Sequence, residues 1–300
     1  SICCIWQLRL RRRWATCDSG SLRDWVDCRI SEIIMTSDLI FLKLGGSLLT
    51  DKTTKEALRA DVLARLAGEI AAARAERPAM RLVLGHGSGS FGHVAGKKHG
   101  TRQGVKTPAQ WTGFAEVADA AARLNRHVIA ALLKEGVPAF GLPPSASAQV
   151  MDGQVEFLMS EQIEKSLDVG LLPVVFGDVA FDAVRGGTII STEEVMEFLS
   201  GGLRPAWFLM AGETTGVFDV HNQVVAEINR VNFQDILPAL GASRGTDVTG
   251  GMASKVSSMI DLVQSQPGMT VRIFSGLEPG LLHRLLVDPR LPVGTAIRQA

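Results

Sequence analysis

Short apolar runs alternate with amphipathic stretches from residue 38 to the end of the chain. Near-continuous apolar character is typical of strands in a parallel sheet whose two faces are both covered. The runs that fit this description predict buried strands at residues 39–44, 81–85, 137–142, 171–178, 206–212 and 271–276.

Between these runs, the hydrophobic positions follow the period of a helix. Val62, Leu66 and Ile70 recur every four residues within 60–77, which places them on one helix face. The same pattern predicts further helices at residues 109–135, 160–168, 192–200, 252–265 and 278–287. The alternation predicts an α/β fold, a three-layer αβα sandwich around a mainly parallel sheet.

Turn signals predict β-hairpin additions to this sheet. Asp152-Gly153 lies between two apolar arms and is a strong two-residue turn signal. Weaker signals predict turns at Gly186-Gly187 and at His221-Asn222.

The body of the chain, residues 35–300, is expected to be one domain with two lobes. Glycine and proline in "SGGLRP", residues 200–205, separate a predicted helix from the next strand. We therefore expect one lobe at 35–202 and one at 203–300.

Residues 1–34 differ from the rest of the chain. They hold all four cysteines (Cys3, Cys4, Cys17 and Cys28) and show no sustained period of strand or helix. Met35 opens a stretch that resembles an ordinary protein start, so we interpret 1–34 as a non-native or disordered extension. A body without cysteine uses no disulfides, which favours the cytoplasm.

Composition excludes two classes of partner. The 300 residues carry 31 basic and 31 acidic side chains, whereas a dedicated nucleic-acid binder normally has a basic face. No apolar run reaches the roughly 18 residues that a membrane span requires. We expect neither nucleic acid nor membrane as a partner.

The first candidate site follows the first predicted strand, in "LKLGGSLLTDK", residues 42–52. Lys43 lies inside an otherwise apolar strand, and a buried lysine is costly without an anionic partner. Gly45 and Gly46 allow close approach of the backbone to a ligand. Ser47 adds a hydroxyl group and Lys52 a second cation.

The second candidate is the glycine-rich loop "HGSGSFGH", residues 86–93. Gly87, Gly89 and Gly92 match the G-x-G-x-x-G fingerprint of dinucleotide-binding proteins. The next predicted strand, however, does not end in the acidic residue that this fingerprint requires. We therefore interpret the loop as a phosphate-binding segment flanked by two histidines.

Two further strand ends complete the set. Gly177 and Asp178 follow the strand at 171–178, where open α/β sheets bind ligands. Gly250 and Gly251 precede a predicted helix that carries Lys255. A cation in a first helical turn opposes the helix dipole, so a bound phosphate would explain Lys255.

Together these residues favour phosphoryl transfer. The chain offers no nucleophilic triad, and its histidines lack companions at zinc spacing, so we expect no protein-bound metal cluster. Lysines and backbone amides stabilise the charge that spreads over the oxygens of a transferring phosphoryl group.

Four motifs in this order resemble the amino acid kinase superfamily. They are "LKLGGSLLTDK", "HGSGSFGH", "FGDVAFD" and "DVTGGMASKV". The resemblance covers residues 39–298, and "GSFGH" and "DVTGGM" resemble its isopentenyl phosphate kinase branch in particular. It implies the amino acid kinase fold, ATP with Mg²⁺, a small-molecule phosphate acceptor, a homodimer and phosphorylation of isopentenyl phosphate to isopentenyl diphosphate.

The resemblance also implies that the lobe at 35–202 binds the acceptor and the lobe at 203–300 binds the nucleotide, and it implies residue roles. Catalysis falls to His93, Lys43, Lys52 and Lys255. The residues placed at ATP are Lys43, Gly45, Gly46, Ser47, Gly89, Glu213, Gly251 and Lys255. The residues placed at the acceptor are Ser88, His93, Gly177, Asp178 and Phe114, of which Phe114 is expected to contact the isoprenyl chain.

Three motifs depart from the family pattern. The usual "HGGG" is "HGSG" here, with Ser88 in place of glycine. The usual "DVDG(I/V)Y" is "ETTGVF" at 213–218. The usual "SGDD" is "STEE" at 191–194, where Ser191 and Glu194 fit a capping box. A fosfomycin-type kinase, another small-molecule kinase of the superfamily and a nucleotide-binding regulator without catalysis remain open alternatives.

Overall fold

An eight-stranded sheet forms the centre of the region that the computed structural model describes, residues 39–51, 54–241 and 251–300. Its strands run in the order β12-β14-β13-β11-β1-β4-β8-β5. They are β1 (Leu39–Leu44), β4 (Arg81–His86), β5 (Ala139–Gly141), β8 (Leu172–Phe176), β11 (Trp207–Gly212), β12 (Glu227–Ile228), β13 (Thr270–Ser275) and β14 (Thr295–Ile297). Every pair is parallel except β13–β14, which confirms the mainly parallel sheet.

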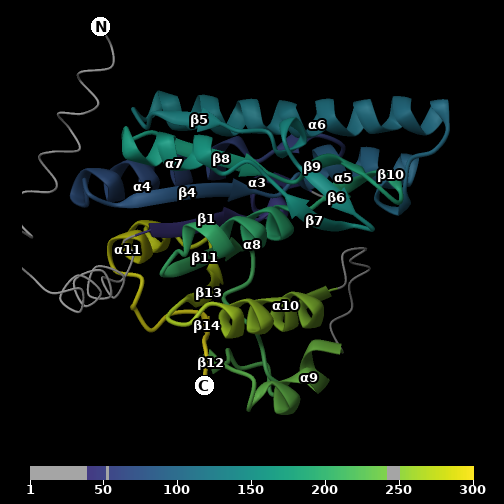
Figure 1. Cartoon of the computed structure of the whole chain (residues 1–300). Helices are drawn as coiled ribbons and strands as arrows, with labels where there is room; N and C mark the ends of the chain where they lie inside the picture. Colours follow the sequence, from purple (N-terminus) through teal and green to yellow (C-terminus); the bar gives the residue numbers. More distant parts are fainter. Residues whose placement is uncertain (1–38, 52–53, 242–250) are drawn as a thin grey trace, which may run out of the picture. The chain divides into compact units, whose positions relative to one another are not determined.

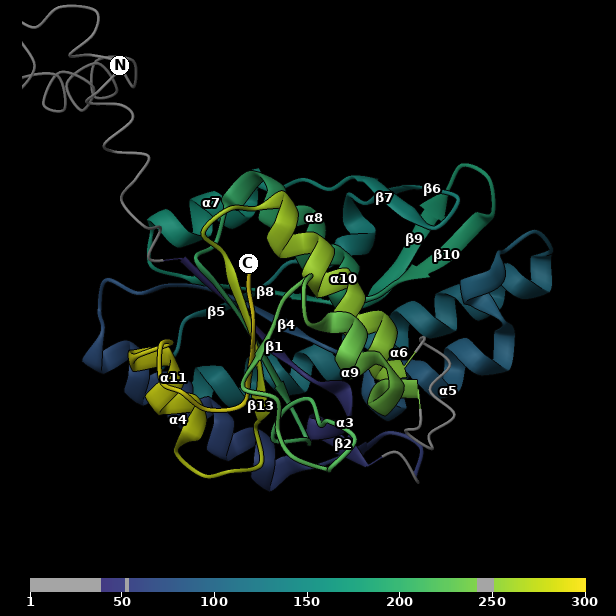
Figure 2. The same ribbon diagram turned by 90° about the horizontal axis from the view of Figure 1, so that it is seen from below.

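Helices cover both faces of the sheet (Figures 1 and 2). One face is packed by α4 (Ala60–Glu76), α6 (Pro108–Lys134) and α11 (Leu281–Val287). The other is packed by α7 (Glu161–Asp168), α8 (Thr192–Leu203), α9 (Phe233–Gly241) and α10 (Gly251–Ser265). This is the predicted three-layer sandwich; α9 is the one helix of these that the sequence pattern did not predict.

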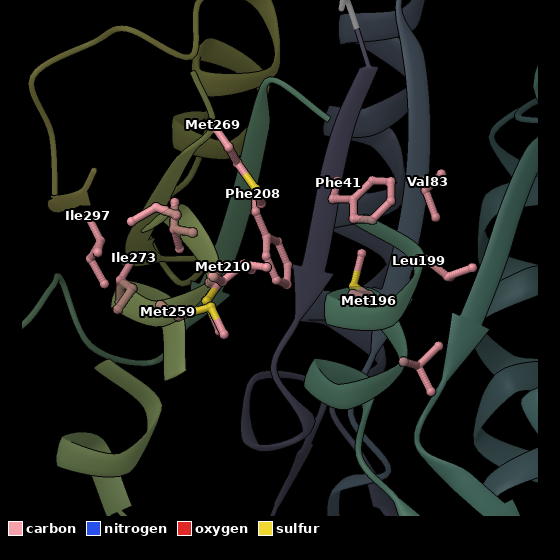
Figure 3. Packing of buried hydrophobic residues seen from close by; sticks show 14 of the residues in the cluster. Phe41, Val83, Met196, Leu199, Phe208, Met210, Met259, Met269, Ile273 and Ile297 are labelled. Carbon is pink, nitrogen blue, oxygen red and sulfur yellow. The ribbon is translucent and has the colours of Figure 1, made fainter. Parts of the chain in front are cut away.

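Alternation along β1 decides which way its lysine points. Leu39 and Phe41 belong to the core on the α8 side, whereas Ile40 and Leu42 belong to the core on the α4 side. Because strand side chains alternate between faces, Lys43 lies on the α8 side. Figure 3 shows Phe41 in that core, where its ring packs edge to face against the ring of Phe208, with centroids 6.2 Å apart.

A second, four-stranded sheet runs in the order β10-β9-β6-β7. Its strands are β6 (Gln149–Met151), β7 (Gln154–Phe157), β9 (Asp178–Asp182) and β10 (Gly186–Ile190), and a two-stranded ladder joins β2 (Thr50–Asp51) to β3 (Ala57–Leu58). The hairpin at Asp152-Gly153 is confirmed, with positive φ angles of 48° and 83°. Phe218 and Val224 form an antiparallel bridge around the turn expected at His221-Asn222.

The turn predicted at Gly186-Gly187 is wrong by a few residues. Both glycines already belong to β10 and pair with Asp182 and Phe181. The chain turns earlier because the carboxylate of Asp182 accepts hydrogen bonds from the backbone N–H groups of Val184 and Arg185, each at 2.8 Å.

The loop interpretation of "HGSGSFGH" is wrong for its second half. Helix α5 (Gly89–His99) begins inside the motif, although glycines disfavour helices. The helix packs against α6, where the ring of His99 lies so close to Gly113 that a side chain there would collide with it. Three basic residues in its last turn and Gly100, with φ of 63°, mark its end.

The remaining predictions concern the N-terminal segment, the residues outside the described ranges and the division into lobes. The chain divides into Ser1–Ser37 and Asp38–Ala300, and residues 1–34, Lys52 and 246–250 lie outside the described residues. The break predicted at 200–205 comes too early, because α8 continues to Leu203 and includes both glycines. The strand that follows, β11, pairs directly with β1 in the common sheet. The division into lobes stays a prediction.

Candidate active site

Two glycine turns meet at the carboxyl ends of β1 and β4. The first leads into the short helix α3 (Gly46–Leu49) and the second into α5. A Cβ atom on Gly46 would lie 2.5 Å from the amide nitrogen of Gly89, and one on Gly87 would lie 2.7 Å from the amide nitrogen of Gly46. These glycines are therefore required by backbone packing between the turns, in addition to any contact with a ligand.

Thr50 joins the two turns through its hydroxyl group. Its Oγ1 donates to the carbonyl oxygen of Gly46 at 2.8 Å and accepts from the backbone N–H of Ser90 at 2.8 Å. Thr50 is fully buried. Sequence reasoning missed this residue because threonine in a short strand carries no distinguishing signal.

Ser88 fits its position without backbone strain. It is the N-cap of α5 with φ of −74°, so glycine is not required there by conformation. The residue with positive φ is Gly89, at 50°. The change from the usual "HGGG" to "HGSG" therefore needs no change of backbone conformation at residue 88.

Lys43 has a carboxylate partner on α8. Its Nζ lies 2.6 Å from Oε1 of Glu193, and the lysine is 9% exposed. The sequence predicted an anionic partner for Lys43 but did not identify this one. Ser191 and Glu194 form the predicted capping box at the start of α8, and this cap fixes the helix turn that presents Glu193.

Lys255 approaches the same carboxylate from α10. Burial raises the pKa of Glu193, but the positive charges of Lys43 and Lys255 outweigh this effect and hold that pKa below its usual value. Two lysines that lie more than two hundred positions apart in the sequence thus converge on one ionised side chain. The same site could hold a phosphoryl group between two ammonium groups.

Two of the residues predicted at the acceptor, Gly177 and Asp178, form hydrogen bonds with neighbouring segments. The N–H of Gly177 donates to the carbonyl oxygen of His86 at 3.4 Å. The carboxylate of Asp178 is 2% exposed and accepts from the N–H groups of Ser145 and Val179 at 3.2 and 2.8 Å. Burial raises the pKa of Asp178. His93 lies one helical turn into α5, on its exposed side.

Phe114 belongs to an aromatic cluster with Trp111 and Phe181. Its ring centroid lies 5.2 Å from that of Trp111 and 5.5 Å from that of Phe181. The three rings come from α6 and from the β9–β10 hairpin, which also carries Gly177 and Asp178 at its start.

The structure describes most, but not all, of the residues predicted at the nucleotide. Glu213, just after β11, forms an ion pair with Arg59 at 2.9 Å. Gly251 begins α10 with a φ of 69°. Gly45 caps α3, and Ser47 lies within it. Lys52 and residues 242–250 lie outside the described ranges.

The described residues contain no group of three or more His, Cys, Asp or Glu side chains that could hold a metal ion. No helix among them is both long and apolar enough to cross a membrane.

Known proteins match the chain over most of its length. The model of the amino acid kinase family matches residues 38–275. Isopentenyl phosphate kinase of Methanothermobacter thermautotrophicus is 31% identical over 83% of this chain and 95% of its own length. That of Haloferax volcanii is 38% identical over 75% of this chain and 88% of its own.

A solved structure agrees with these sequence relatives. It is described as "X-ray structures of isopentenyl phosphate kinase", has a TM-score of 0.73 and 28% identity, and covers 86% of this chain and 99% of its own. Because the family model matches most of the chain, including the glycine turns and the α8 carboxylate, the chain belongs to the amino acid kinase family.

Proposed function

We propose that the protein transfers the γ-phosphoryl group of ATP to isopentenyl phosphate and releases isopentenyl diphosphate and ADP. The observation that carries this proposal is the convergence of Lys43 and Lys255 on Glu193 beside the start of α5. Phosphoryl transfer depends mainly on positioning and on charge stabilisation. The names of the relatives supply the acceptor.

The acceptor needs no general base. A phosphate monoester has a second pKa near ~6, so its oxygen is already a nucleophile at neutral pH. One of its oxygens forms the new bond to the γ-phosphorus, while the bond from that phosphorus to the β–γ bridging oxygen breaks. The two lysines offset the repulsion between the anions, and His93 donates a hydrogen bond to the acceptor phosphate.

The hydrogen bonds of Asp178 favour a structural role over that of a base for a hydroxyl acceptor. A hydroxyl group would require a carboxylate base, and Asp178 was the candidate that the sequence offered. Its carboxylate is buried and accepts two backbone hydrogen bonds. We assign it instead to shaping the acceptor site next to Gly177.

The aromatic cluster would contact the hydrocarbon end of the acceptor. Phe114 packs against Trp111 and Phe181, on the elements that carry the predicted acceptor residues. Apolar rings in this position would exclude water from an isoprenyl chain.

Magnesium is expected to arrive with ATP. Mg²⁺ in such sites is held largely by phosphate oxygens and water rather than by an all-protein cage. When bound, it would neutralise charge on the β- and γ-phosphates. We also propose a homodimer, by family resemblance, and a cytoplasmic location, since the body of the chain lacks cysteine.

A coupled assay of ADP release tests the proposal. The full chain is supplied with MgATP and either isopentenyl phosphate, fosfomycin or glutamate, and ³¹P NMR identifies the product. We expect turnover with isopentenyl phosphate and a diphosphate product. Faster turnover with fosfomycin or glutamate would assign another kinase activity, and ATP binding without any turnover would indicate a regulator.

A further inference from the structure

His86 is a buried histidine that the proposed transfer does not use. It ends β4, its side chain is fully buried, and its ring stacks on Phe176 with centroids 5.4 Å apart. Nδ1 lies 3.2 Å from the carbonyl oxygen of Gly87, and Nε2 lies 3.2 Å from Oδ1 of Asn125 on α6.

The backbone of His86 connects the remaining parts of the site. Its carbonyl oxygen accepts from Oγ1 of Thr192 at 2.6 Å and from the N–H of Gly177 at 3.4 Å. Thr192 begins α8 and directly precedes Glu193, the partner of Lys43. His86 therefore forms hydrogen bonds with the glycine turn at Gly87, with Gly177 and with the start of α8, the helix that carries Glu193.

The hydrogen-bond partners select one protonation form of the ring. Burial lowers the pKa of His86, so the ring is neutral at pH 7 and has a single N–H. The carbonyl of Gly87 can only accept, and the backbone fixes its place. The amide of Asn125 can turn by half a rotation and donate through Nδ2 instead. The consistent arrangement has the proton on Nδ1.

This hydrogen bond determines the direction of the next amide. The carbonyl of Gly87 and the N–H of Ser88 belong to one planar trans peptide and point in opposite directions. A ring that holds the oxygen inward therefore turns the N–H of Ser88 outward. That N–H is the group expected at the acceptor phosphate.

We propose that His86, as the neutral Nδ1–H tautomer, is a positioning residue that orients the Gly87–Ser88 peptide toward the acceptor phosphate. This proposal rests on the proposed function. His86 acts through the peptide and touches no reacting atom. This role explains why the motif at 86–93 begins with a buried histidine, His86, in addition to the exposed His93 at its end.

Three variants separate positioning from packing. His86→Phe keeps an aromatic ring but removes the donor to Gly87. His86→Asn keeps a donor near the place of Nδ1. Phe176→Leu, the control, loosens the stack and leaves both hydrogen bonds. We expect His86→Phe to lower kcat/KM for the acceptor by at least about tenfold, the loss of one oriented hydrogen bond, with the larger part in KM.

The pattern across variants decides the outcome. His86→Asn should recover most of the loss, and Phe176→Leu should lower Tm while leaving kcat and KM within about twofold, because packing alone does not orient the peptide. The proposal is overturned if His86→Phe matches Phe176→Leu in kinetics, or if His86→Asn is no better than His86→Phe.

An independent readout keeps this proposal distinct from the proposed function. ¹⁵N NMR of histidine-labelled wild-type protein at pH 7, with His86→Asn for assignment, should show a neutral ring protonated on Nδ1. An Nε2–H ring or an imidazolium would contradict the proposal even if the enzyme were active. If wild type did not turn over isopentenyl phosphate, the affinity for inorganic phosphate would replace KM, and the same order of variants is required.

Discussion

Two buried cations occupy the central sheet, and they are held in different ways. Lys43 in β1 pairs at 2.6 Å with a carboxylate carried by α8. Arg272 in β13 is 5% exposed and donates to the carbonyl oxygens of Pro289 and Val293 at 3.2 and 2.6 Å. Its guanidinium group also lies 5.7 Å from the ring centre of Trp207.

The difference separates a structural cation from one suited to chemistry. Carbonyl oxygens of the backbone are fixed by the fold, and Arg272 uses them to hold the segment between α11 and β14. A glutamate side chain can change rotamer, and Glu193 is shared with Lys255. Lys43 can therefore exchange its partner for a phosphate oxygen, whereas Arg272 cannot leave without unfolding its segment.

Removal of Lys43 should have the largest effect, on rate. In Lys43→Met the chain length is kept and the charge is lost. We expect kcat to fall about a thousandfold, or roughly 4 kcal/mol in the barrier, because the proposed function places this charge at the transferring group. The coupled assay measures kcat, and Lys134→Met, an exposed lysine on α6, is the control. A kcat within tenfold of wild type would remove Lys43 from the reaction.

Removal of Arg272 should affect stability instead. Arg272→Met leaves the carbonyl groups of Pro289 and Val293 without their donors, so we expect the free energy of unfolding to fall by about 3 kcal/mol. Urea denaturation measures this loss, while kcat of the folded fraction should stay within twofold. Arg284→Met removes an exposed ion pair with Glu278 and should cost less than about 1 kcal/mol.

The comparison would fail if Arg272→Met lost activity without losing stability. Such a result would place Arg272 in the reaction and would make the two cations alike.

Neutralising Glu193 sharpens the contrast on the lysine side. Glu193→Gln keeps the shape but removes the charge that draws Lys43 and Lys255 together. We expect kcat to fall about tenfold, since the lysines lose their common anchor but keep their own charge. Glu161→Gln breaks an exposed Glu–Lys pair on α7 and should leave kcat unchanged. An unchanged kcat in Glu193→Gln would mean that the pair does not position Lys43.

The sequence predicted the sheet well because its signals are local. A mostly apolar run such as residues 39–44 fits a strand covered on both faces, and it contains no glycine or proline that would favour a turn instead. The turn at Gly186-Gly187 was misplaced because the carboxylate of Asp182 closes the chain earlier. Helix α5 was missed because glycines hide a helix that tertiary packing stabilises.

The candidate site was predictable in its backbone and not in its pairings. Glycine turns and strand-end lysines are visible as residue types, and so is the need of Lys43 for an anion. Which anion it meets depends on the approach of α8 to β1, a long-range contact that no spacing encodes. Thr50 was missed for the same reason, since its hydroxyl group bonds to a distant turn. His86 was visible as a histidine flanking the glycine-rich segment, but its hydrogen bonds with Asn125 and Thr192 are also long-range.

The smallest expected effect concerns Glu197, one helical turn beyond Glu193 on α8. Burial is the main cause that raises the pKa of Glu197 to about 7, and the charges of nearby Glu194, Glu193 and Asp261 add to it. A carboxyl group whose pKa is raised from 4.5 stabilises the fold fully below pH 4.5. That contribution is lost as the pH rises through 7.

Glu197→Gln should therefore stabilise the protein above pH 7 and not at pH 4.5. We expect a gain of about 1 kcal/mol in the free energy of unfolding at pH 8, which discounts the pKa shift for partial exposure. Urea denaturation at both values measures it, with Glu164→Gln on exposed α7 surface as the control. An equal change at both pH values would show that Glu197 ionises normally. A gain confined to pH 8 would instead show that Glu197 is protonated at low pH, so that the negative charge facing Lys43 is carried by Glu193, one exchangeable partner, as the contrast with Arg272 requires.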